Sequence, residues 1–167
     1  MKTVEIEIPI GYEIDKEKST FEKIVFKKIK NELVDLGLPS GNLWKNINED
    51  GYFTYNDAVE KFKDNLPTIV DFAELVHYCQ WKWSSKLKGM VVIGPNKNQI
   101  IFPVVGFYDY DIKSPCDVGS YGGYLSESYE SNNSNLAYGL HIYPRDVALA
   151  SYDRCNYGYS VRYVKHK

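Results

Sequence analysis

The periodicity of the apolar residues changes from helical to strand-like at Trp81 in this chain of 167 residues. Upstream of it, Thr54 and Thr68 each stand three residues before an aspartate, which is the spacing of a capping box at the start of a helix. Apolar residues then recur every three or four positions and predict helices over residues 54–63 and 68–79. Downstream, short apolar runs separated by Gly, Pro and Asn predict strands. Two short helices followed by a strand-rich C-terminal half predict an α+β fold.

The sequence of residues 1–30 predicts a structural element that is separate from the rest of the chain. The segment "TVEIEIP" alternates glutamate with apolar residues, as a strand with one face against protein does. The segment "FEKIVFKKIK" predicts a second strand, and the polar stretch "DKEKST" separates the two. We therefore expect an N-terminal β hairpin over residues 1–30. This arm either folds onto the domain of residues 31–167 or attaches the protein to a carrier.

The charge balance argues against nucleic acid and membrane as partners. The formal net charge is −2, the pI is about 5.9, and the lysines are scattered along the chain. No apolar run approaches the roughly 18 residues that a membrane span needs. The N-terminal "MKTVEIEIPIGYEIDKEK" lacks the continuous apolar segment of a secretory signal peptide. We expect a protein that is made in the cytoplasm without a Sec-type leader.

Motifs for catalysis and for metal binding are missing from the sequence. Cys79, Cys116 and Cys155 form no CxxC, which favours three free thiols and leaves one disulfide as the alternative. No GxSxG, HExxH, P-loop or GxGxxG motif occurs. Calcium needs six to eight oxygen ligands, and the aspartates of residues 109–117 are too few to predict such a site. We expect no catalytic residue, no metal and no cofactor.

Tyrosine and arginine are concentrated at one end of the chain. Eleven of the fifteen tyrosines follow residue 100, and Arg145, Arg154 and Arg162 all lie in the last 23 positions. Tyrosine gives a large stiff surface with a polar tip and arginine a planar fork of donors, so both are enriched at binding hot spots. Tyrosine is also common in strands for packing reasons alone. The region is therefore either a recognition surface or an ordinary strand surface.

Five segments of the chain appear in the order of a known family. They are "DLGLPSGNLW", "LPTIVDFAELVHYCQWKW", "GPNKNQIIFPVVGFY", "VGSYGGYLSES" and "YGYSVRYV". Over about residues 33–164 the chain resembles the Fibrobacter succinogenes major paralogous domain, a DUF1566-like family. The resemblance implies a C-type-lectin-like fold for residues 31–167. It also implies that Arg162, at the end of the family's closing Gly-x-Ser-Val-Arg motif, is a buried or semi-buried residue of the fold. The stretch "IPIGYEIDKEKSTFEKIVFKK" is similar to segments at the front of Bacteroidales phage and prophage proteins. One departure is "YLSE" at 124–127, where the family has Tyr-Trp-Ser-Ser.

The resemblance also implies where a ligand binds. In relatives that retroelements diversify, the varied positions match residues 143–157 here. The ligand-binding residues implied in this way are Tyr143, Arg145, Ser151, Tyr152, Arg154 and Asn156, with Tyr108, Tyr110 and Tyr129 at the rim. We expect a non-catalytic phage or prophage surface protein that binds a bacterial-surface glycan or protein. The alternative is a structural or decoration protein of a virion, whose Tyr-rich face packs on another subunit. Contacts of the arm with virion subunits and homo-oligomers fit either function.

Overall fold

Two short helices lie between strands, in the places where the sequence predicts them. The computed structural model describes residues 12–20, 23–28, 30, 32–129, 136–153 and 157–167. Helix α1 spans Tyr55–Phe62 and helix α2 spans Ile69–Tyr78, with the 3-10 turn η1 (Lys63–Asn65) between them. The hydroxyl of Thr68 accepts the Asp71 N–H at 3.1 Å, and the Asp71 carboxylate accepts the Thr68 N–H at 2.7 Å. This is the capping box that the sequence predicts.

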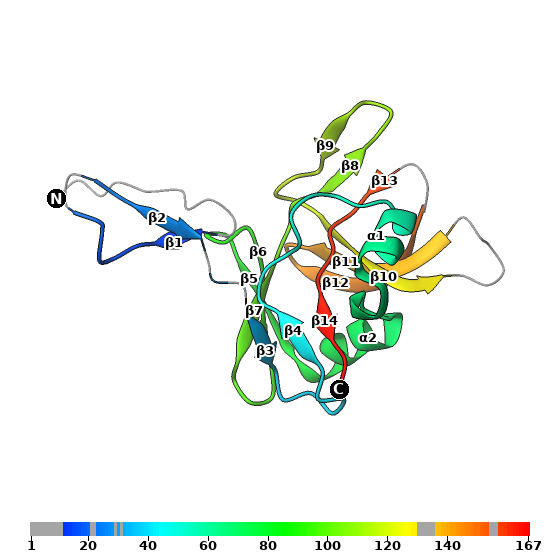
Figure 1. Ribbon diagram of the computed structural model, residues 1–167, viewed down its shortest axis with the longest axis horizontal. Helices are drawn as coiled ribbons and strands as arrows, with labels where there is room; N and C mark the ends of the chain where they lie inside the picture. The colour runs from blue at the N-terminus through cyan, green and yellow to red at the C-terminus, as the bar shows by residue number, and fades with distance from the viewer. Residues whose placement is uncertain (1–11, 21–22, 29, 31, 130–135, 154–156) are drawn as a thin grey trace.

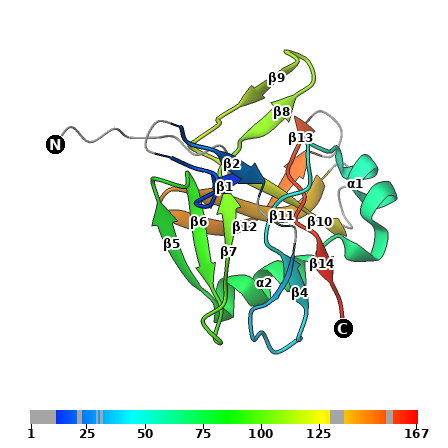
Figure 2. The same cartoon turned by 60° about the vertical axis from the view of Figure 1, so that its left-hand side comes forward.

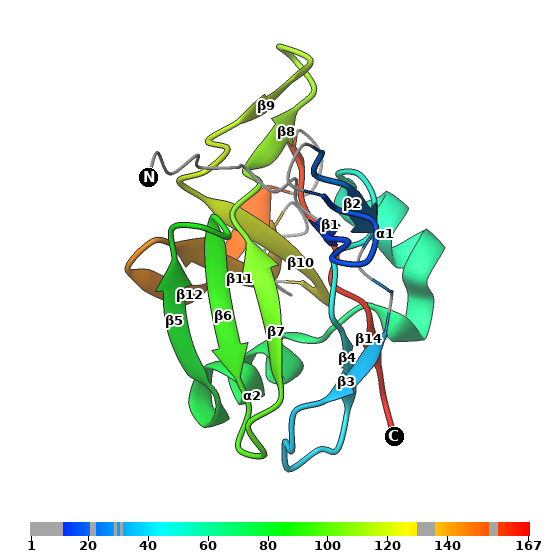
Figure 3. The same ribbon diagram turned by 90° about the vertical axis from the view of Figure 1, so that its left-hand side faces the viewer.

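The strands form small antiparallel sheets, so the fold is α+β (Figure 1). The strands are β1 (Tyr12–Ile14), β2 (Phe26–Lys28), β3 (Leu33–Asp35), β4 (Leu43–Lys45), β5 (Gln80–Ser84), β6 (Gly89–Ile93), β7 (Gln99–Pro103), β8 (Phe107–Asp109), β9 (Ser114–Cys116), β10 (Gly122–Tyr129), β11 (Leu136–Tyr143), β12 (Asp146–Asp153), β13 (Tyr157–Gly158) and β14 (Val164–Lys165). Their orders are β1-β2, β10-β11-β12, β13-β8-β9, β14-β4-β3 and β5-β6-β7. The strands of β5-β6-β7 cross those of β10-β11-β12 in Figures 2 and 3.

The larger core cluster lies among helix α2 and the sheets β10-β11-β12 and β5-β6-β7. Its members include the fully buried side chains of Trp44, Phe72, Phe102, Tyr124 and Leu140. The rings of Phe102 and Tyr124 meet edge to face with centroids 4.9 Å apart. A second cluster, beneath α1, contains aromatic and aliphatic side chains from α1, β10 and the C-terminal segment. This second cluster supports the candidate site described below.

Arg162 is buried in the fold, as the sequence analysis expects. Its guanidinium lies 4.4 Å from the ring centroid of Phe102 and donates to the Lys45 carbonyl at 2.8 Å and the Asn48 side-chain oxygen at 2.6 Å. Burial lowers the pKa of Arg162 to about 10, and the nearby Tyr124 hydroxyl and Glu49 carboxylate oppose that shift. Arg162 therefore ties the C-terminal segment to two other parts of the chain.

A hairpin is present in the N-terminal segment and extends away from the rest of the molecule in Figure 1. Strands β1 and β2 pair from Tyr12 with Lys28 to Ile14 with Phe26. The Asp15 carboxylate accepts the backbone N–H groups of Glu17 and Lys18, both at 3.2 Å, and so closes the turn after β1. The predicted strand "TVEIEIP" lies outside the described residues. The partner of β2 is thus a later segment than the one that the sequence analysis chose.

The segment of residues 108–121 contains a second hairpin, although its polar composition is typical of a long loop. Strands β8 and β9 pair, with Phe107 opposite Cys116, and β13 pairs with the other edge of β8. The Asp109 carboxylate accepts the backbone N–H of Asp111 at 2.9 Å and of Ile112 at 3.2 Å, so the polar residues make the turn. The hairpin projects from the top of the molecule in Figures 1 and 3.

Among the described helices, none is long and apolar enough to cross a bilayer.

Candidate functional site

An aromatic recess of about 480 Å³ lies where the hairpin β8–β9 meets the sheet β10-β11-β12. Six of its lining residues have aromatic rings and three have small polar or charged side chains. The residues of this aromatic recess are Phe107, Asp117, Ser120, Tyr121, His141, Tyr143, Ser151, Tyr157 and Tyr159. Tyr143 and Ser151 belong to the set predicted from the sequence.

Close backbone contact between the hairpin and β10 brings these residues together. Gly106 forms a parallel bridge with Gly122, and the Gly106 N–H donates to the Tyr121 carbonyl at 2.7 Å. Gly106 has φ +75°, and a Cβ at this position would lie 1.8 Å from the Cys116 carbonyl oxygen. Only glycine fits this conformation and this space. Gly106 therefore sets the distance between the strand that holds Phe107 and the strand that follows Tyr121.

The rings of the recess contact one another in a continuous series. The ring centroids of Tyr121 and Tyr143 are 5.3 Å apart, those of Phe107 and Tyr157 are 5.2 Å apart, and those of Phe107 and Tyr121 are 6.1 Å apart. Phe107, Tyr121 and Tyr157 also pack on the second core cluster. Aromatic pairs at these separations are favourable beyond their buried area. The recess is thus held in shape by packing from behind, while Tyr143 remains 41% exposed.

His141 lies in the recess as a neutral imidazole. It follows Leu140 on β11, and its Nδ1 is 3.1 Å from the Tyr121 hydroxyl oxygen. Burial lowers the pKa of His141 to about 4, so the ring is uncharged at neutral pH. A tyrosine hydroxyl can either donate or accept, which suits either neutral tautomer of the histidine.

Asp117 fixes the turn that delivers Tyr121 to the recess. Its φ is +56°, and its carbonyl accepts the N–H groups of Ser120 at 3.1 Å and of Tyr121 at 3.0 Å. The Ser120 hydroxyl donates to the same carbonyl at 3.1 Å. The backbone of Asp117 is therefore committed to the turn, whereas its side chain is exposed to solvent.

The residues predicted from the 143–157 stretch divide between the recess and other places. Tyr143 and Ser151 line the recess. Arg145 is exposed in the turn between β11 and β12 and is not a lining residue. The backbone of Tyr152 is in β12 opposite Ala137, and its side chain lies outside the described part of the structure, as do Arg154 and Asn156.

The three predicted rim tyrosines lie away from the recess. Tyr108 alternates with Phe107 along β8, and its ring contacts Tyr52 at 6.0 Å and Tyr110 at 5.0 Å between centroids. Tyr108 and Tyr110 thus form an aromatic cluster on the opposite face of the hairpin. Tyr129 pairs with Ala137, six residues from Tyr143 along β11, which is roughly 20 Å at about 3.3 Å per residue.

Most of the recess residues were not singled out by the sequence analysis. Phe107, Tyr121 and His141 were not candidates, and Tyr157 and Tyr159 are more buried than Tyr143 and pack on the core as well as lining the recess. One available signal is that His141 precedes Tyr143 by two positions in a strand, which places both on one face. The other residues come from separate segments, so no local pattern links them.

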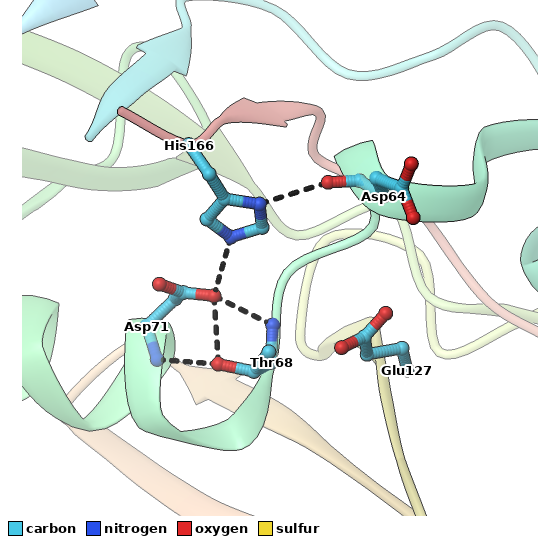
Figure 4. Close-up of a pocket in the computed structure, with 5 residues that line it drawn as sticks. All are labelled: Asp64, Thr68, Asp71, Glu127 and His166. Atoms are coloured by element: carbon cyan, nitrogen blue, oxygen red, sulfur yellow. Dashed lines mark hydrogen bonds and ion pairs between the residues drawn. The ribbon is translucent and has the colours of Figure 1, made fainter.

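A second hollow, of about 360 Å³, is lined by polar side chains between the two helices and the C-terminal segment (Figure 4). The residues of this polar pocket are Asp64, Thr68, Asp71, Glu127 and His166. Asp71 Oδ2 accepts from Thr68 N at 2.7 Å, Thr68 Oγ1 at 2.7 Å and His166 Nε2 at 3.0 Å. Asp71 Oδ1 accepts from Asn42 Nδ2 at 2.8 Å. One buried carboxylate therefore links Thr68, Asn42 and His166.

His166 is held between two acceptors in the polar pocket. Its Nδ1 is 2.8 Å from the Asp64 carbonyl oxygen and its Nε2 is 3.0 Å from the Asp71 carboxylate, as Figure 4 shows. A carbonyl and a carboxylate only accept, so both contacts are hydrogen bonds only when both ring nitrogens are protonated. Partial burial lowers the pKa of His166, but the bonds to Asp71 and Asp64 and the charges of Asp71 and Glu127 raise it more, and the net shift is upward.

The described residues include no group of three or more His, Cys, Asp or Glu side chains placed to hold a metal ion. Cys79 and Cys116 are free thiols, and Cys155 lies outside the described part of the chain. Burial and, to a lesser extent, the Glu74 carboxylate raise the pKa of Cys79 to about 11. The Cys79 thiol is therefore protonated at neutral pH, which makes it a poor nucleophile.

Comparison of the chain with protein-family models, with curated proteins and with solved structures found no match.

Proposed function

We propose that this protein is a non-catalytic recognition domain that binds a bacterial-surface glycan in the aromatic recess. The observation that supports this function best is the recess itself. Its volume of about 480 Å³ lies within the range of roughly 300–1,000 Å³ that is typical of small-ligand sites. Such sites combine a mainly apolar and aromatic lining with a few polar groups that orient the ligand. The six rings and the side chains of Asp117, Ser120 and Ser151 have this composition.

The side chains that line the recess favour a glycan over a protein as the ligand. A sugar ring has apolar C–H faces that pack on aromatic rings and hydroxyl groups at its edges that need hydrogen-bond partners. Tyr143 offers an exposed ring at the mouth, and Ser120 and Ser151 offer hydroxyl groups. Four of the six rings pack on the core before any ligand arrives, so little conformational entropy is lost there on binding. These are Phe107, Tyr121, Tyr157 and Tyr159.

The setting of this function is proposed from the resemblances noted in the sequence. The resemblance over residues 33–164 supports a C-type-lectin-like fold, and the resemblance of the N-terminal segment supports placement on a phage or prophage particle. In this arrangement the β1–β2 hairpin contacts a carrier subunit. The hairpin extends away from the other sheets in Figure 1, which suits an attachment element.

A second candidate function is that of a structural or decoration protein in a virion. The observation that favours it is the apolar surface of the projecting β8–β9 hairpin and the loop after it, where Ile112 is 63% exposed and Val118 is 58% exposed. Large exposed apolar patches are typical of surfaces that another subunit covers, and a subunit packed on this hairpin would bury both side chains. In that case the tyrosines contact protein instead of sugar.

The test of the proposed function is binding of the purified protein to intact Bacteroidales cells and to their extracted capsular polysaccharides. Tyr143→Ala removes the most exposed ring of the recess and should weaken binding by about tenfold, or about 1.4 kcal/mol. Tyr78→Ala is the matched control, because Tyr78 is 49% exposed on α2 and does not line the recess. It should bind as the unmodified protein does.

Two outcomes of this experiment separate the candidates. Saturable binding that Tyr143→Ala weakens and Tyr78→Ala does not supports the recess as a glycan site. A well-folded protein that binds neither cells nor polysaccharide contradicts the proposed function. It also favours the decoration protein, which is then sought by its assembly with other virion subunits.

A further inference from the structure

The charge of the recess comes from one residue. Among its nine described lining residues, Asp117 is the only one with a formal charge at neutral pH. The remaining side chains are aromatic rings, two serine hydroxyls and His141, which is neutral because burial lowers its pKa to about 4. Arg145 is exposed in the turn after Tyr143 and is not a lining residue. The described lining is therefore negative overall.

The Asp117 carboxylate is not used by the fold. The backbone carbonyl of Asp117 accepts hydrogen bonds from Ser120 and Tyr121, so the conformation of the turn depends on the main chain. The carboxylate itself forms no hydrogen bond or ion pair with any residue that the structure describes. A structural carboxylate normally accepts from a nearby N–H, as those of Asp15, Asp71 and Asp109 do here. The Asp117 side chain is therefore available to a ligand.

The aromatic rings around Asp117 have the same electrostatic preference. The face of an aromatic ring is negative, so a cation near it is attracted by about 0.5–1 kcal/mol at an exposed site and by more where water is excluded. Phe107 and Tyr157 meet edge to face at 84°, so their ring faces point in different directions. The ring of Tyr143 lies 41% exposed at the mouth. Aromatic rings in several orientations beside a carboxylate form the kind of site that recognises an organic ammonium group.

We propose that the ligand of the aromatic recess bears a positively charged amino group, as an amino sugar with a free amine does. This inference rests on the proposed function, because it names the class of sugar that the same site selects. The ammonium group lies between the Asp117 carboxylate and the rings of Phe107, Tyr143 and Tyr157. The hydroxyls of Ser120 and Ser151 form hydrogen bonds with the hydroxyl groups of the sugar. A sugar with a carboxylate in place of the amine is repelled by Asp117.

The experiment compares three sugars of similar ring structure that differ in charge: glucosamine, N-acetylglucosamine and glucuronic acid. Each is titrated into the isotopically labelled full chain at pH 6, where the amine is protonated and His141 is still neutral. The readout is the shift of the ring signals of Tyr143 and Tyr157. We expect glucosamine to bind about fivefold more tightly than N-acetylglucosamine, because one exposed charge pair contributes at most about 1 kcal/mol. Glucuronic acid should bind least.

Two variants assign the charge preference to one carboxylate. Asp117→Asn keeps the size of the side chain and removes its charge, so it should abolish the preference for glucosamine over N-acetylglucosamine. Asp111→Asn is the matched control, because Asp111 is an exposed aspartate in the turn of the same hairpin and does not line the recess. It should keep the preference. In the unmodified protein, added salt should reduce the preference for glucosamine.

The possible failures separate this inference from the proposed function. If glucosamine and N-acetylglucosamine shift the Tyr143 and Tyr157 signals with equal affinity, the recess binds sugar but does not select charge, and only this inference is overturned. Preference for glucuronic acid, or a preference for glucosamine that persists in Asp117→Asn, overturns it as well. If glucosamine shifts neither ring signal, the inference is also wrong, and the proposed function then depends on the binding to cells and capsular polysaccharide.

Discussion

The aromatic recess and the polar pocket each contain one histidine, and the atoms around the two rings differ in kind. In the recess, His141 faces the Tyr121 hydroxyl, which can donate or accept. In the polar pocket, His166 lies between the Asp64 carbonyl and the Asp71 carboxylate, which can only accept. Burial lowers the pKa of His141 to about 4, whereas the partners of His166 raise its pKa above the ordinary value. The surroundings of His141 therefore favour the neutral imidazole, whereas those of His166 favour the protonated ring.

The two regions also differ in how their stability is distributed. The recess is a series of ring contacts, in which several side chains share the packing energy. The polar pocket depends on one carboxylate, because Asp71 accepts hydrogen bonds from Thr68, Asn42 and His166. Loss of a single ring should thus leave the recess partly intact, whereas loss of Asp71 should remove the pocket as a unit.

Asp71→Ala tests this difference and should have the largest effect on stability. Asp71 is 7% exposed, and its removal leaves the donors of Thr68 and Asn42 without their acceptor in a buried position. We expect a loss of about 3 kcal/mol in the free energy of unfolding, which combines a lost helix cap with lost hydrogen bonds to a charged group. The measurement is urea unfolding at pH 7.

Asp57→Ala is the control for Asp71→Ala. Asp57 stands at the same place in α1, three residues after Thr54, but it is exposed, and its carboxylate accepts only from the Thr54 hydroxyl. A cost of about 1 kcal/mol or less is expected for it. Equal costs for the two variants would show that Asp71 acts only as a helix cap and that the pocket is not a unit.

The starts of the two helices also show what the sequence could predict, although only α2 forms the full capping box, because at α1 the Asp57 carboxylate accepts from the Thr54 hydroxyl and not from its backbone N–H. Thr54 and Thr68 lie within three residues of their partners, so the start of each helix is encoded locally. The burial of Arg162 was likewise expected, from the family resemblance.

The recess could not be predicted in this way. Phe107, Tyr121, His141 and Tyr157 meet because β13 pairs with β8 and because the backbone at Gly106 lies against β10. These are non-local contacts, and a strand pattern specifies neither its partner nor its register. The β8–β9 hairpin was missed for a related reason, since the aspartates that form its turn are also typical of loops. Tyr143 was a candidate because of the resemblance, and its neighbours in space were not.

His141 should make the protein less stable in acid. The unfolded chain takes up a proton at this histidine near its ordinary pKa of about 6.5, whereas the folded chain resists protonation down to about pH 4. Stability is therefore fully present above pH 6.5 and falls as the pH decreases from 6.5 to 4. His141 is partly exposed, and solvent screening limits this loss to at most about 2 kcal/mol.

His141→Gln tests the loss of stability in acid. The variant should flatten the decline of the melting temperature between pH 6.5 and 4, because glutamine does not titrate in this range. His77→Gln, which removes an exposed imidazole from α2, should leave the decline in place. An unchanged decline in His141→Gln would show that the acid sensitivity arises elsewhere and would contradict the neutral state of this ring.

His166 should have the opposite and smaller effect. Its raised pKa means that its stabilising contribution is fully present below about pH 6.5 and is lost as the pH rises through the folded pKa. His166→Gln should therefore cost stability at pH 5.5 and little at pH 8.5. The His166 side chain is 36% exposed, and solvent screening should keep the cost at pH 5.5 below about 1 kcal/mol.

The titration of the two imidazoles by NMR gives the sharpest form of the comparison. The chemical shifts of the carbon-bound ring protons should show a pKa above 6.5 for His166 and one well below 6.5 for His141. In Asp71→Asn, where the carboxylate becomes an uncharged amide, the pKa of His166 should fall and that of His141 should not change. If His166 titrates at or below 6.5 in the unmodified protein, the ring does not donate to both acceptors. One of the two contacts would then be absent in solution. If the pKa values of both histidines shift together in Asp71→Asn, the recess and the polar pocket are coupled. The two regions would then not differ in the way proposed, with many ring contacts in one and a single carboxylate in the other.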